Sequence, residues 1–277
     1  ARTFWAAQAR TRAAGGGLVL RIEDLDGPRC RPEFTAAILE DLRWFGFAWD
    51  EGPDVGGPHA PYVQSARLDL CRAAFARLRE AGRLFPCSCS RRDIAALSAP
   101  HAGDEEPVYP GTCRHRPATF DPPSAARISW RFRVPDGEAI TFHDAWQGTQ
   151  SFVAGRAFGD FIVWRHDGLP SYQLACAVDD AAMAISEVVR GADLLVSTAR
   201  QLLLYRALGL AAPAFCHVPL LTDGRGVRLA KRHAALGLRA LRAAGACPAG
   251  LRAGWPDFTR PAPPPPEGRE GPGPLRH

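Results

Sequence analysis

The sequence predicts an α/β fold with a mainly parallel sheet, and two observations support this prediction. Short apolar runs of strand length alternate with amphipathic segments of helical length along the chain. Polar and charged residues directly follow several of the apolar runs, and parallel sheets bind ligands at the carboxyl ends of their strands. The 277 residues, 46% hydrophobic and 23% charged, suffice for one large domain or two modest ones.

The first third of the chain contains three segments with helical spacing and one short apolar run. Residues 4–14 form the first helical segment, which ends at three consecutive glycines. Residues 34–45 and 68–84 repeat apolar side chains every three or four positions, which predicts two further helices. The run at 18–22 predicts a buried strand, followed by the carboxylates of Glu23, Asp24 and Asp26.

The second half of the chain contains further strand-like runs, at residues 128–134, 161–163, 174–178, 184–189 and 217–221. Ser197 or Thr198 is suitably placed to cap a helix that runs to Leu208. Polar residues follow two of these runs, Asp179 with Asp180 and Arg190 with Asp193. We therefore expect a ligand site where these strand ends meet the carboxylates after residue 22.

Composition and charge exclude some classes of protein. No apolar run approaches the roughly 18 residues of a membrane-spanning helix, and no secretory signal opens the chain, so we expect a cytoplasmic protein without a membrane partner. The chain does not begin with Met, and we expect its natural start to lie upstream. From residue 223 onward ten basic residues face four acidic ones, which favours contact with phosphate or nucleic acid, although solubility alone would explain it.

Three cysteines lie in a segment with few apolar residues. Cys87 and Cys89 are two positions apart, and Cys113 follows across the irregular residues 86–123. Because Zn²⁺ takes four ligands in a tetrahedron, we expect these thiolates to hold a structural zinc, the alternative being three unrelated cysteines. Chemistry alone favours a histidine as fourth ligand, His115 before His101, and Tyr109 is the less usual candidate.

Three single residues are candidate ligand contacts, each with a structural alternative. Glu23 can bind an amine or a metal, or belong to a solvated turn. Tyr172 can place its hydroxyl at a pocket rim, as tyrosines of many cores do. Arg190 ends an apolar run and needs a partner if it is buried, either a substrate carboxylate or Asp193.

A basic loop follows the Gly-rich turn near residue 224, with the sequence Arg228, Leu229, Ala230, Lys231 and Arg232. Lys231 is the only lysine among the 34 basic residues, which points to a role that arginine does not fill. Three cations in five residues suit a polyphosphate ligand, whereas the alternative is a basic surface loop.

In order along the chain, LRIEDLD at 20–26, residues 171–209 and RLAKR at 228–232 resemble segments of class I aminoacyl-tRNA synthetases of the glutamyl group. The resemblance extends from residue 1 to about residue 240. It implies a Rossmann-like catalytic domain over 1–222 that contains a zinc-bound insertion at 86–123. A KMSKS-like loop with a short helical region would follow at 223–260. Independently of the resemblance, seven prolines among residues 261–277 predict a disordered tail.

Within this group the chain most resembles the glutamyl-queuosine tRNA(Asp) synthetase family. That family has a Cys-x-Cys…Tyr-x₃-Cys zinc site, which matches Cys87, Cys89, Tyr109 and Cys113 and so favours Tyr109 over His115 as fourth ligand. After the basic loop, moreover, the remaining 45 residues leave no room for the anticodon-binding region of a full glutamyl-tRNA synthetase.

The family activates L-glutamate with ATP and transfers the glutamyl group to queuosine in the anticodon stem-loop of tRNA(Asp). The resemblance assigns Glu23, Tyr172 and Arg190 to glutamate and Lys231 to the ATP phosphates, with Mg²⁺ on those phosphates. Two departures are the absence of the family's P-S-P-T-G-x-L-H-x-G segment and an alanine, Ala230, at a serine position of the loop. The alternatives are therefore a truncated or non-catalytic tRNA-binding descendant, and a fragment of a conventional glutamyl-tRNA synthetase.

Overall fold

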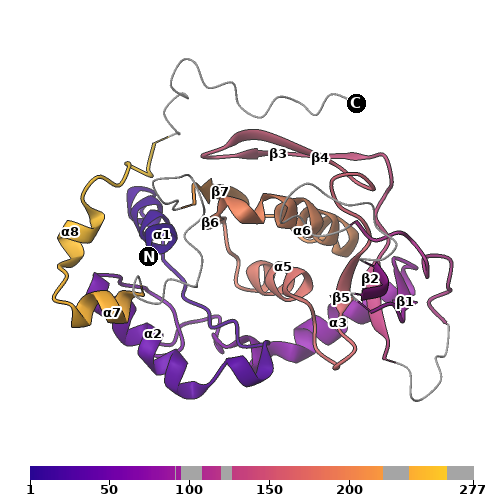
Figure 1. Cartoon of the computed structure of the whole chain (residues 1–277), viewed down its shortest axis with the longest axis horizontal. Helices are drawn as coiled ribbons and strands as arrows, with labels where there is room; N and C mark the ends of the chain where they lie inside the picture. The colour runs from indigo at the N-terminus through magenta and orange to yellow at the C-terminus, as the bar shows by residue number, and fades with distance from the viewer. Residues whose placement is uncertain (91, 95–107, 120–126, 221–236, 261–277) are drawn as a thin grey trace.

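The computed structural model describes residues 1–90, 92–94, 108–119, 127–220 and 237–260 (Figure 1). Its α-helices are α1 (Arg2–Ala13), α2 (Pro32–Phe45), α3 (Leu68–Glu80), α5 (Tyr172–Ala182), α6 (Leu195–Leu208), α7 (Leu238–Ala243) and α8 (Pro248–Arg252). Its strands are β1 (Leu84–Cys87), β2 (Ser129–Phe132), β3 (Ala139–Asp144), β4 (Gly148–Val153), β5 (Phe161–Trp164), β6 (Glu187–Gly191) and β7 (Ala214–Val218). Short 3₁₀ turns are η1 (Gly27–Arg29), η2 (Gln64–Arg67) and η3 (Ala192–Leu194).

The named strands form two sheets. In the three-stranded sheet, β2 lies between β1 and β5 and pairs antiparallel with both. The four-stranded sheet has the order β4-β3-β7-β6, in which β3 and β4 form an antiparallel hairpin. The strands β3 and β6 both pair parallel with β7, and Arg190 of β6 lies opposite His217 of β7.

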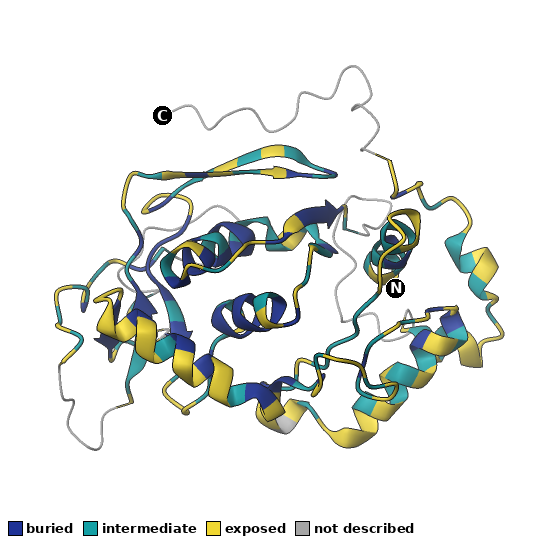
Figure 2. Ribbon diagram, turned by 180° about the vertical axis from the view of Figure 1, so that it is seen from behind, coloured by how far each residue is buried: buried dark blue, intermediate teal, exposed yellow. Residues whose placement is uncertain are grey.

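Helix α5 runs through the centre of the main hydrophobic core (Figure 2). Every residue from Leu174 to Asp180 is buried, so the helix is covered all round by protein. Side chains of α3, α6 and both sheets complete this core. The first turn of α5 carries Tyr172, which is 41% exposed, whereas the helix after it is anchored in the core.

A second, aromatic cluster joins the C-terminal helices to α1 and α2. The ring of Phe45 stacks on Phe47 at 5.2 Å and on Trp255 at 5.7 Å between centroids. The guanidinium of Arg252 lies 4.2 Å from the ring centroid of Trp5. These contacts fix the position of α1 beside the candidate site described below.

Most of the helices and strands predicted by periodicity are confirmed. The helical segments at 4–14, 34–45 and 68–84 correspond to α1, α2 and α3, although α3 ends at Glu80 and the strand β1 begins at Leu84. The strand-like runs at 128–134, 161–163, 184–189 and 217–221 overlap β2, β5, β6 and β7, respectively.

Three local predictions are wrong. Residues 174–178 belong to helix α5 rather than to a strand, because Ser171 caps the helix by accepting from the amide of Leu174 at 3.5 Å. Residues 18–22 are extended but form only isolated parallel bridges, Val19 with Glu51 and Ile22 with Val63. Helix α6 begins at Leu195, so Ser197 and Thr198 lie inside its first turn and do not cap it.

The prediction of a mainly parallel sheet is also wrong for the part of the chain that the structure describes. Three of the five strand pairings are antiparallel, and the hairpin of β3 and β4 was not predicted. Residues 18–21 and residues 187–189 of β6 both line one cavity. The fold is therefore mixed α/β, and Asp179 and Asp180 end a helix rather than a strand.

Two predicted regions are only partly described. Within the segment 86–123 the structure describes residues 86–90, 92–94 and 108–119, and the tail at 261–277 lies outside the described residues. The short helices α7 and α8 follow residue 236. Of the helices that the structure describes, none has the length and hydropathy needed to cross a bilayer.

Candidate active site

Arg190 is the buried cation of the candidate site, and strand β6 positions it. The residue is only 7% exposed. Nη1 of its guanidinium lies 3.4 Å from the phenolic oxygen of Tyr172. Its other nitrogens contact His217, Thr198 and Gln201 at 3.1, 2.6 and 2.8 Å. Asp193, the alternative partner expected from the sequence, is not among the side chains that contact the guanidinium.

The charge of Arg190 is not neutralised by direct contact with a carboxylate in the described part of the chain. All four of its side-chain partners are uncharged groups or a histidine ring. A buried cation is costly unless an anion or a full set of acceptors compensates it. Since Nε and Nη2 are already engaged, the free edge for an incoming anion is Nη1, beside the Tyr172 hydroxyl.

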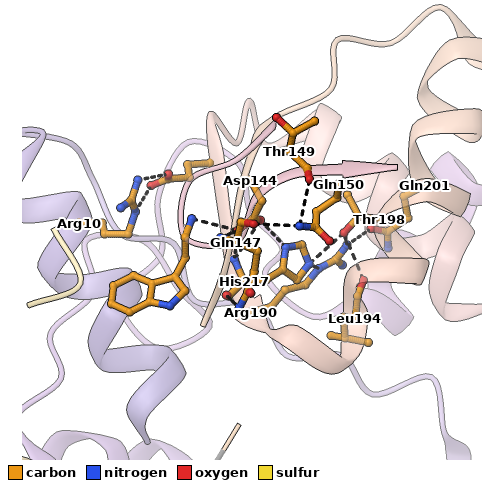
Figure 3. A network of polar contacts seen from close by, with 12 residues as sticks. Arg10, Asp144, Gln147, Thr149, Gln150, Arg190, Leu194, Thr198, Gln201 and His217 are labelled. Atoms are coloured by element: carbon orange, nitrogen blue, oxygen red, sulfur yellow. Dashed lines mark hydrogen bonds and ion pairs between the residues drawn. The ribbon is translucent and has the colours of Figure 1, made fainter. Parts of the chain in front are cut away.

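A chain of polar side chains continues from Arg190 into the four-stranded sheet (Figure 3). His217 Nε2 faces Arg190, and His217 Nδ1 lies 2.6 Å from Oδ2 of Asp144 at the end of β3. Both His217 and Asp144 are fully buried. Sequence analysis missed this pair; the signal available was a single histidine inside the apolar run Phe215 to Leu221.

Glu23 reaches the same helix as Tyr172. Its Oε1 accepts a hydrogen bond from Arg21 Nη2 at 2.9 Å and lies 3.4 Å from the thiol of Cys176. Cys176 is four residues after Tyr172, so both face the same side of α5. The structure therefore brings the three residues predicted for glutamate, Glu23, Tyr172 and Arg190, to one face of this helix.

The two carboxylates next to Glu23 have other contacts. Asp24 accepts hydrogen bonds from the amide and hydroxyl of Ser65, at 2.8 and 2.6 Å, and so closes a loop. Asp26 pairs with Arg29 at 3.1 Å on the surface. Of the three carboxylates predicted as candidates, only Glu23 lies at the site.

Glu23 belongs to a cluster of buried or half-buried ion pairs. Arg21 donates to Asp180 at 2.7 Å as well as to Glu23, and Asp179 accepts from Arg67 at 2.7 Å. Burial raises the pKa of Asp180, against the lowering effect of Arg21. The sequence drew attention to Asp179 and Asp180 but not to their arginine partners, which come from segments more than 100 residues away.

A cavity of about 530 Å³ adjoins the site. Helix α1, the extended residues 16–21 and residues 185–189 form its walls, and Glu23 and Asp180 also line it. Its volume lies within the range of about 300 to 1,000 Å³ typical of small-molecule sites. Glu23 thus faces both the cavity and the side of α5 that carries Tyr172.

The three cysteines predicted to bind a metal lie together. The sulfur atoms of Cys87, Cys89 and Cys113 are within 4.8 Å of one another, and those of Cys89 and Cys113 are 3.7 Å apart. Tetrahedral Zn–S bonds of about 2.3 Å place sulfur atoms about 3.8 Å apart. Burial, despite the opposing hydrogen bond to Tyr109, raises the pKa of Cys89 to about 11. A bound dication would offset this cost by stabilising the thiolates.

The fourth donor that the geometry offers is the phenolic oxygen of Tyr109. It lies 3.4 Å from Cys87 Sγ and 3.8 Å from Cys89 Sγ, and it accepts from the backbone amide of Cys113 at 2.8 Å. Among the described residues no histidine joins the cysteine group, and His115 instead lines a neighbouring pocket that Tyr109 also lines. His101 lies outside the described residues.

The basic loop predicted to bind phosphate, Arg228, Leu229, Ala230, Lys231 and Arg232, lies outside the described residues. Its position relative to Glu23, Tyr172 and Arg190 therefore stays a prediction.

Comparison with known proteins identifies the family of this chain. The family described as "tRNA synthetases class I (E and Q), catalytic domain" matches residues 1–254. A glutamyl-Q tRNA(Asp) synthetase of Symbiobacterium thermophilum is 53% identical over 258 residues, which is 90% of this chain and 78% of that protein. A protein of the same name from Nitratidesulfovibrio vulgaris is 48% identical over 246 residues, 87% of this chain and 76% of that protein.

A solved structure supports the same relationship. The crystal structure of a glutamate-tRNA synthetase from Elizabethkingia anophelis superposes with a TM-score of 0.71 at 29% identity, over 83% of this chain. The chain spans about half, 49%, of the length of that synthetase. The chain belongs to the class I tRNA synthetases of the E and Q group and, within it, to the family of the glutamyl-Q tRNA(Asp) synthetases.

Proposed function

We propose that this protein activates L-glutamate with ATP to glutamyl-adenylate and transfers the glutamyl group to queuosine in the anticodon of tRNA(Asp). The observation that carries the proposal is Arg190, a buried guanidinium with no carboxylate partner among the described residues, whose Nη1 contacts only the Tyr172 hydroxyl among them. A substrate carboxylate at that edge would supply the missing anion. The names of the relatives given above supply the substrates.

In this proposal the three residues around α5 hold the amino acid. Arg190 and Tyr172 would bind a carboxylate through Nη1 and the phenolic hydroxyl, which lie 3.4 Å apart. Both contacts that described residues make to Glu23 are at Oε1, so Oε2 is available for the substrate ammonium. Catalysis then depends on orientation and electrostatics, because the attacking group is a carboxylate of the substrate itself.

The proposal also assigns residues to the ATP phosphates and to a structural metal. Lys231 of the basic loop would balance the charge of the phosphates as pyrophosphate leaves. Mg²⁺ bound to those phosphates would neutralise further charge. The four donors Cys87, Cys89, Tyr109 and Cys113 would hold one structural Zn²⁺, away from the reacting groups. We place the reaction in the cytoplasm.

The proposal is tested by following labelled glutamate onto purified tRNA. We expect glutamate-dependent ATP–pyrophosphate exchange, and transfer to queuosine-containing tRNA(Asp) but not to the same tRNA lacking queuosine. The variant Arg190→Ala should raise the glutamate concentration needed for half-maximal exchange by about a hundredfold, since a charged hydrogen-bond partner is lost. Glu138→Gln, a change in a surface ion pair with Arg206, is the matched control.

Each alternative has a distinct outcome in the same assay. Glutamate on the 3′ end of tRNA(Glu) would identify a fragment of a conventional glutamyl-tRNA synthetase. Binding of tRNA without any glutamate-dependent exchange would identify a non-catalytic descendant. An unchanged glutamate requirement in Arg190→Ala would remove Arg190 from the site.

A further inference from the structure

The orientation of the Arg190 guanidinium is set by groups that would not touch a substrate. Nε donates to His217 Nε2 at 3.1 Å, and Nη2 donates to Thr198 at 2.6 Å and to Gln201 at 2.8 Å. The partner side chains are themselves buried, with exposures of 1% or less. Only Nη1 faces Tyr172, so these contacts decide which edge of the guanidinium is free.

The contact with Arg190 determines the protonation of His217. A guanidinium can only donate hydrogen bonds, so the ring nitrogen that faces its Nε must be an acceptor. The single ring proton of His217 therefore sits on Nδ1 and is donated to Asp144 at 2.6 Å. The opposite tautomer would give Nε2–H the Thr198 oxygen as an acceptor at 2.9 Å, but it would also place two N–H groups against each other across the 3.1 Å contact with Arg190.

The side chain of Asp144 is surrounded by hydrogen-bond donors. It accepts from the backbone amides of Trp146, Gln147 and His217 at 3.0, 2.8 and 3.0 Å, besides the His217 ring. Although burial acts in the opposite direction, these hydrogen bonds lower the pKa of Asp144. The surroundings contain four donors and suit a carboxylate, whereas an amide would turn an N–H towards one of them.

We infer that Asp144 and His217 are positioning residues for the substrate carboxylate: Asp144 fixes the Nδ1–H tautomer of His217, and His217 thereby holds Arg190 with Nη1 free. This inference rests on the proposed function for its substrate. Its structural part, the tautomer and the orientation of Arg190, does not depend on that function. Asp144, His217 and Arg190 come from three different strands, so their arrangement depends on the pairing of β3, β7 and β6.

The inference predicts a specific kinetic effect of Asp144→Asn in the full chain. The amide that replaces the carboxylate would force the His217 proton to Nε2 and displace Arg190, so the KM for glutamate should rise about tenfold to a hundredfold. Arg190 is proposed to bind the substrate carboxylate equally in the ground state and in the transition state. Losing this contact should therefore change kcat far less than KM. Thr198→Val, which removes one acceptor of Arg190 without touching Asp144, should raise the same KM by about tenfold.

Asp160→Asn is the matched control. Asp160 is similarly buried and accepts from the amide of Val134 and from Arg114, but it lies beside the cysteine-rich segment and is not a partner of Arg190. Its substitution should leave the KM for glutamate within about twofold of the original value, the variation expected of a residue that does not contact the network. A KM that rises equally in Asp144→Asn and Asp160→Asn would show a general structural effect and overturn the inference.

A measurement on the unsubstituted protein decides the structural part by itself. Heteronuclear NMR of protein with isotope-labelled histidine should show His217 as the neutral Nδ1–H tautomer at neutral pH, with the resonance assigned by its loss in His217→Gln. A protonated Nε2 would overturn the inference even if every variant failed to fold. If the protein shows no glutamate-dependent exchange, the proposed function fails, whereas the NMR result still decides whether Asp144 and His217 orient Arg190.

Discussion

At the scale of single residues, arginine carries nearly all the positive charge of this protein, and two buried arginines differ in whether a carboxylate neutralises them. Arg190 is buried without a carboxylate partner among the described residues, which suits a ligand site. Arg67 is equally buried but has one, because its Nε lies 2.7 Å from Asp179. Its Nη1 also donates to the backbone carbonyls of His59 and Pro61. We therefore expect Arg67 to contribute to stability, whereas Arg190 is the arginine that we propose to bind a ligand.

The first prediction concerns the stability contributed by Arg67. Arg67→Ala leaves the buried carboxylate of Asp179 without its main partner, and we expect the free energy of unfolding to fall by about 3–5 kcal/mol. Arg72→Ala breaks an ion pair with Asp69 whose members are 59% and 96% exposed, and should cost under about 1 kcal/mol. Urea unfolding of both variants measures the difference, and equal losses would contradict the prediction.

Single residues also show what a sequence pattern leaves open. Glu23, Asp24 and Asp26 are equivalent candidates in the sequence, because each is a carboxylate after the same apolar run. Contacts with Cys176 and with Ser65 distinguish Glu23 from Asp24. Neither contact is visible locally, since Cys176 is 153 residues from Glu23 and Ser65 is 41 residues from Asp24.

At the scale of elements, periodicity predicted the exposed helices better than the buried one. Helices α2 and α3 each have one apolar face, so their spacing is visible in the sequence. Helix α5 is buried all round, and a buried apolar run of five residues has the composition of a strand. The cap at Ser171 and four alanines among eleven residues were the available signs of a helix.

The cysteine-rich segment is the element for which metal removal gives the clearest prediction. Cys89→Ser and Cys113→Ser each remove one donor from the proposed site and should abolish stoichiometric zinc binding, measured by elemental analysis of purified protein. Tyr109→Phe should weaken zinc binding, because it removes the fourth donor, whereas His115→Ala should not. Cys247→Ser, at an exposed cysteine, is the control.

The result for the unsubstituted protein decides whether this element is a zinc site. About one equivalent of zinc is expected for a single tetrahedral site. Less than about half an equivalent would contradict it. Loss of zinc in His115→Ala but not in Tyr109→Phe would instead assign the fourth ligand to His115.

At the scale of the whole molecule, the net charge predicts how the affinity for tRNA depends on salt concentration. The net charge is +5, and the basic residues after residue 223 account for the excess. Contacts between arginine and phosphate release counterions, so binding to tRNA(Asp) should weaken with salt. We expect the dissociation constant to rise about tenfold or more between roughly 50 and 200 mM NaCl. Filter binding or fluorescence anisotropy measures this change, and an affinity independent of salt would exclude an electrostatic interface.

The sequence by itself determined those features that depend on near neighbours. Helical spacing predicted α1, α2 and α3, and the spacing of Cys87, Cys89 and Cys113 predicted the group of cysteines that the structure brings together. Near neighbours suffice for the helices because a helix face repeats within four residues. The mixed direction of the strands, and the cavity lined by residues 16–21 and 185–189, depend instead on which distant segments pack together.

Only the tertiary structure decided which polar groups act together. Asp144 meets His217 across 73 residues of sequence, and Glu23 meets Cys176 across 153. Such contacts exist because burial removes polar groups from water and makes each require a partner, wherever along the chain that partner lies. The sequence identifies Arg190 as a cation at a strand end, but the edge that it offers to a ligand follows from what the folded chain packs against its other nitrogens.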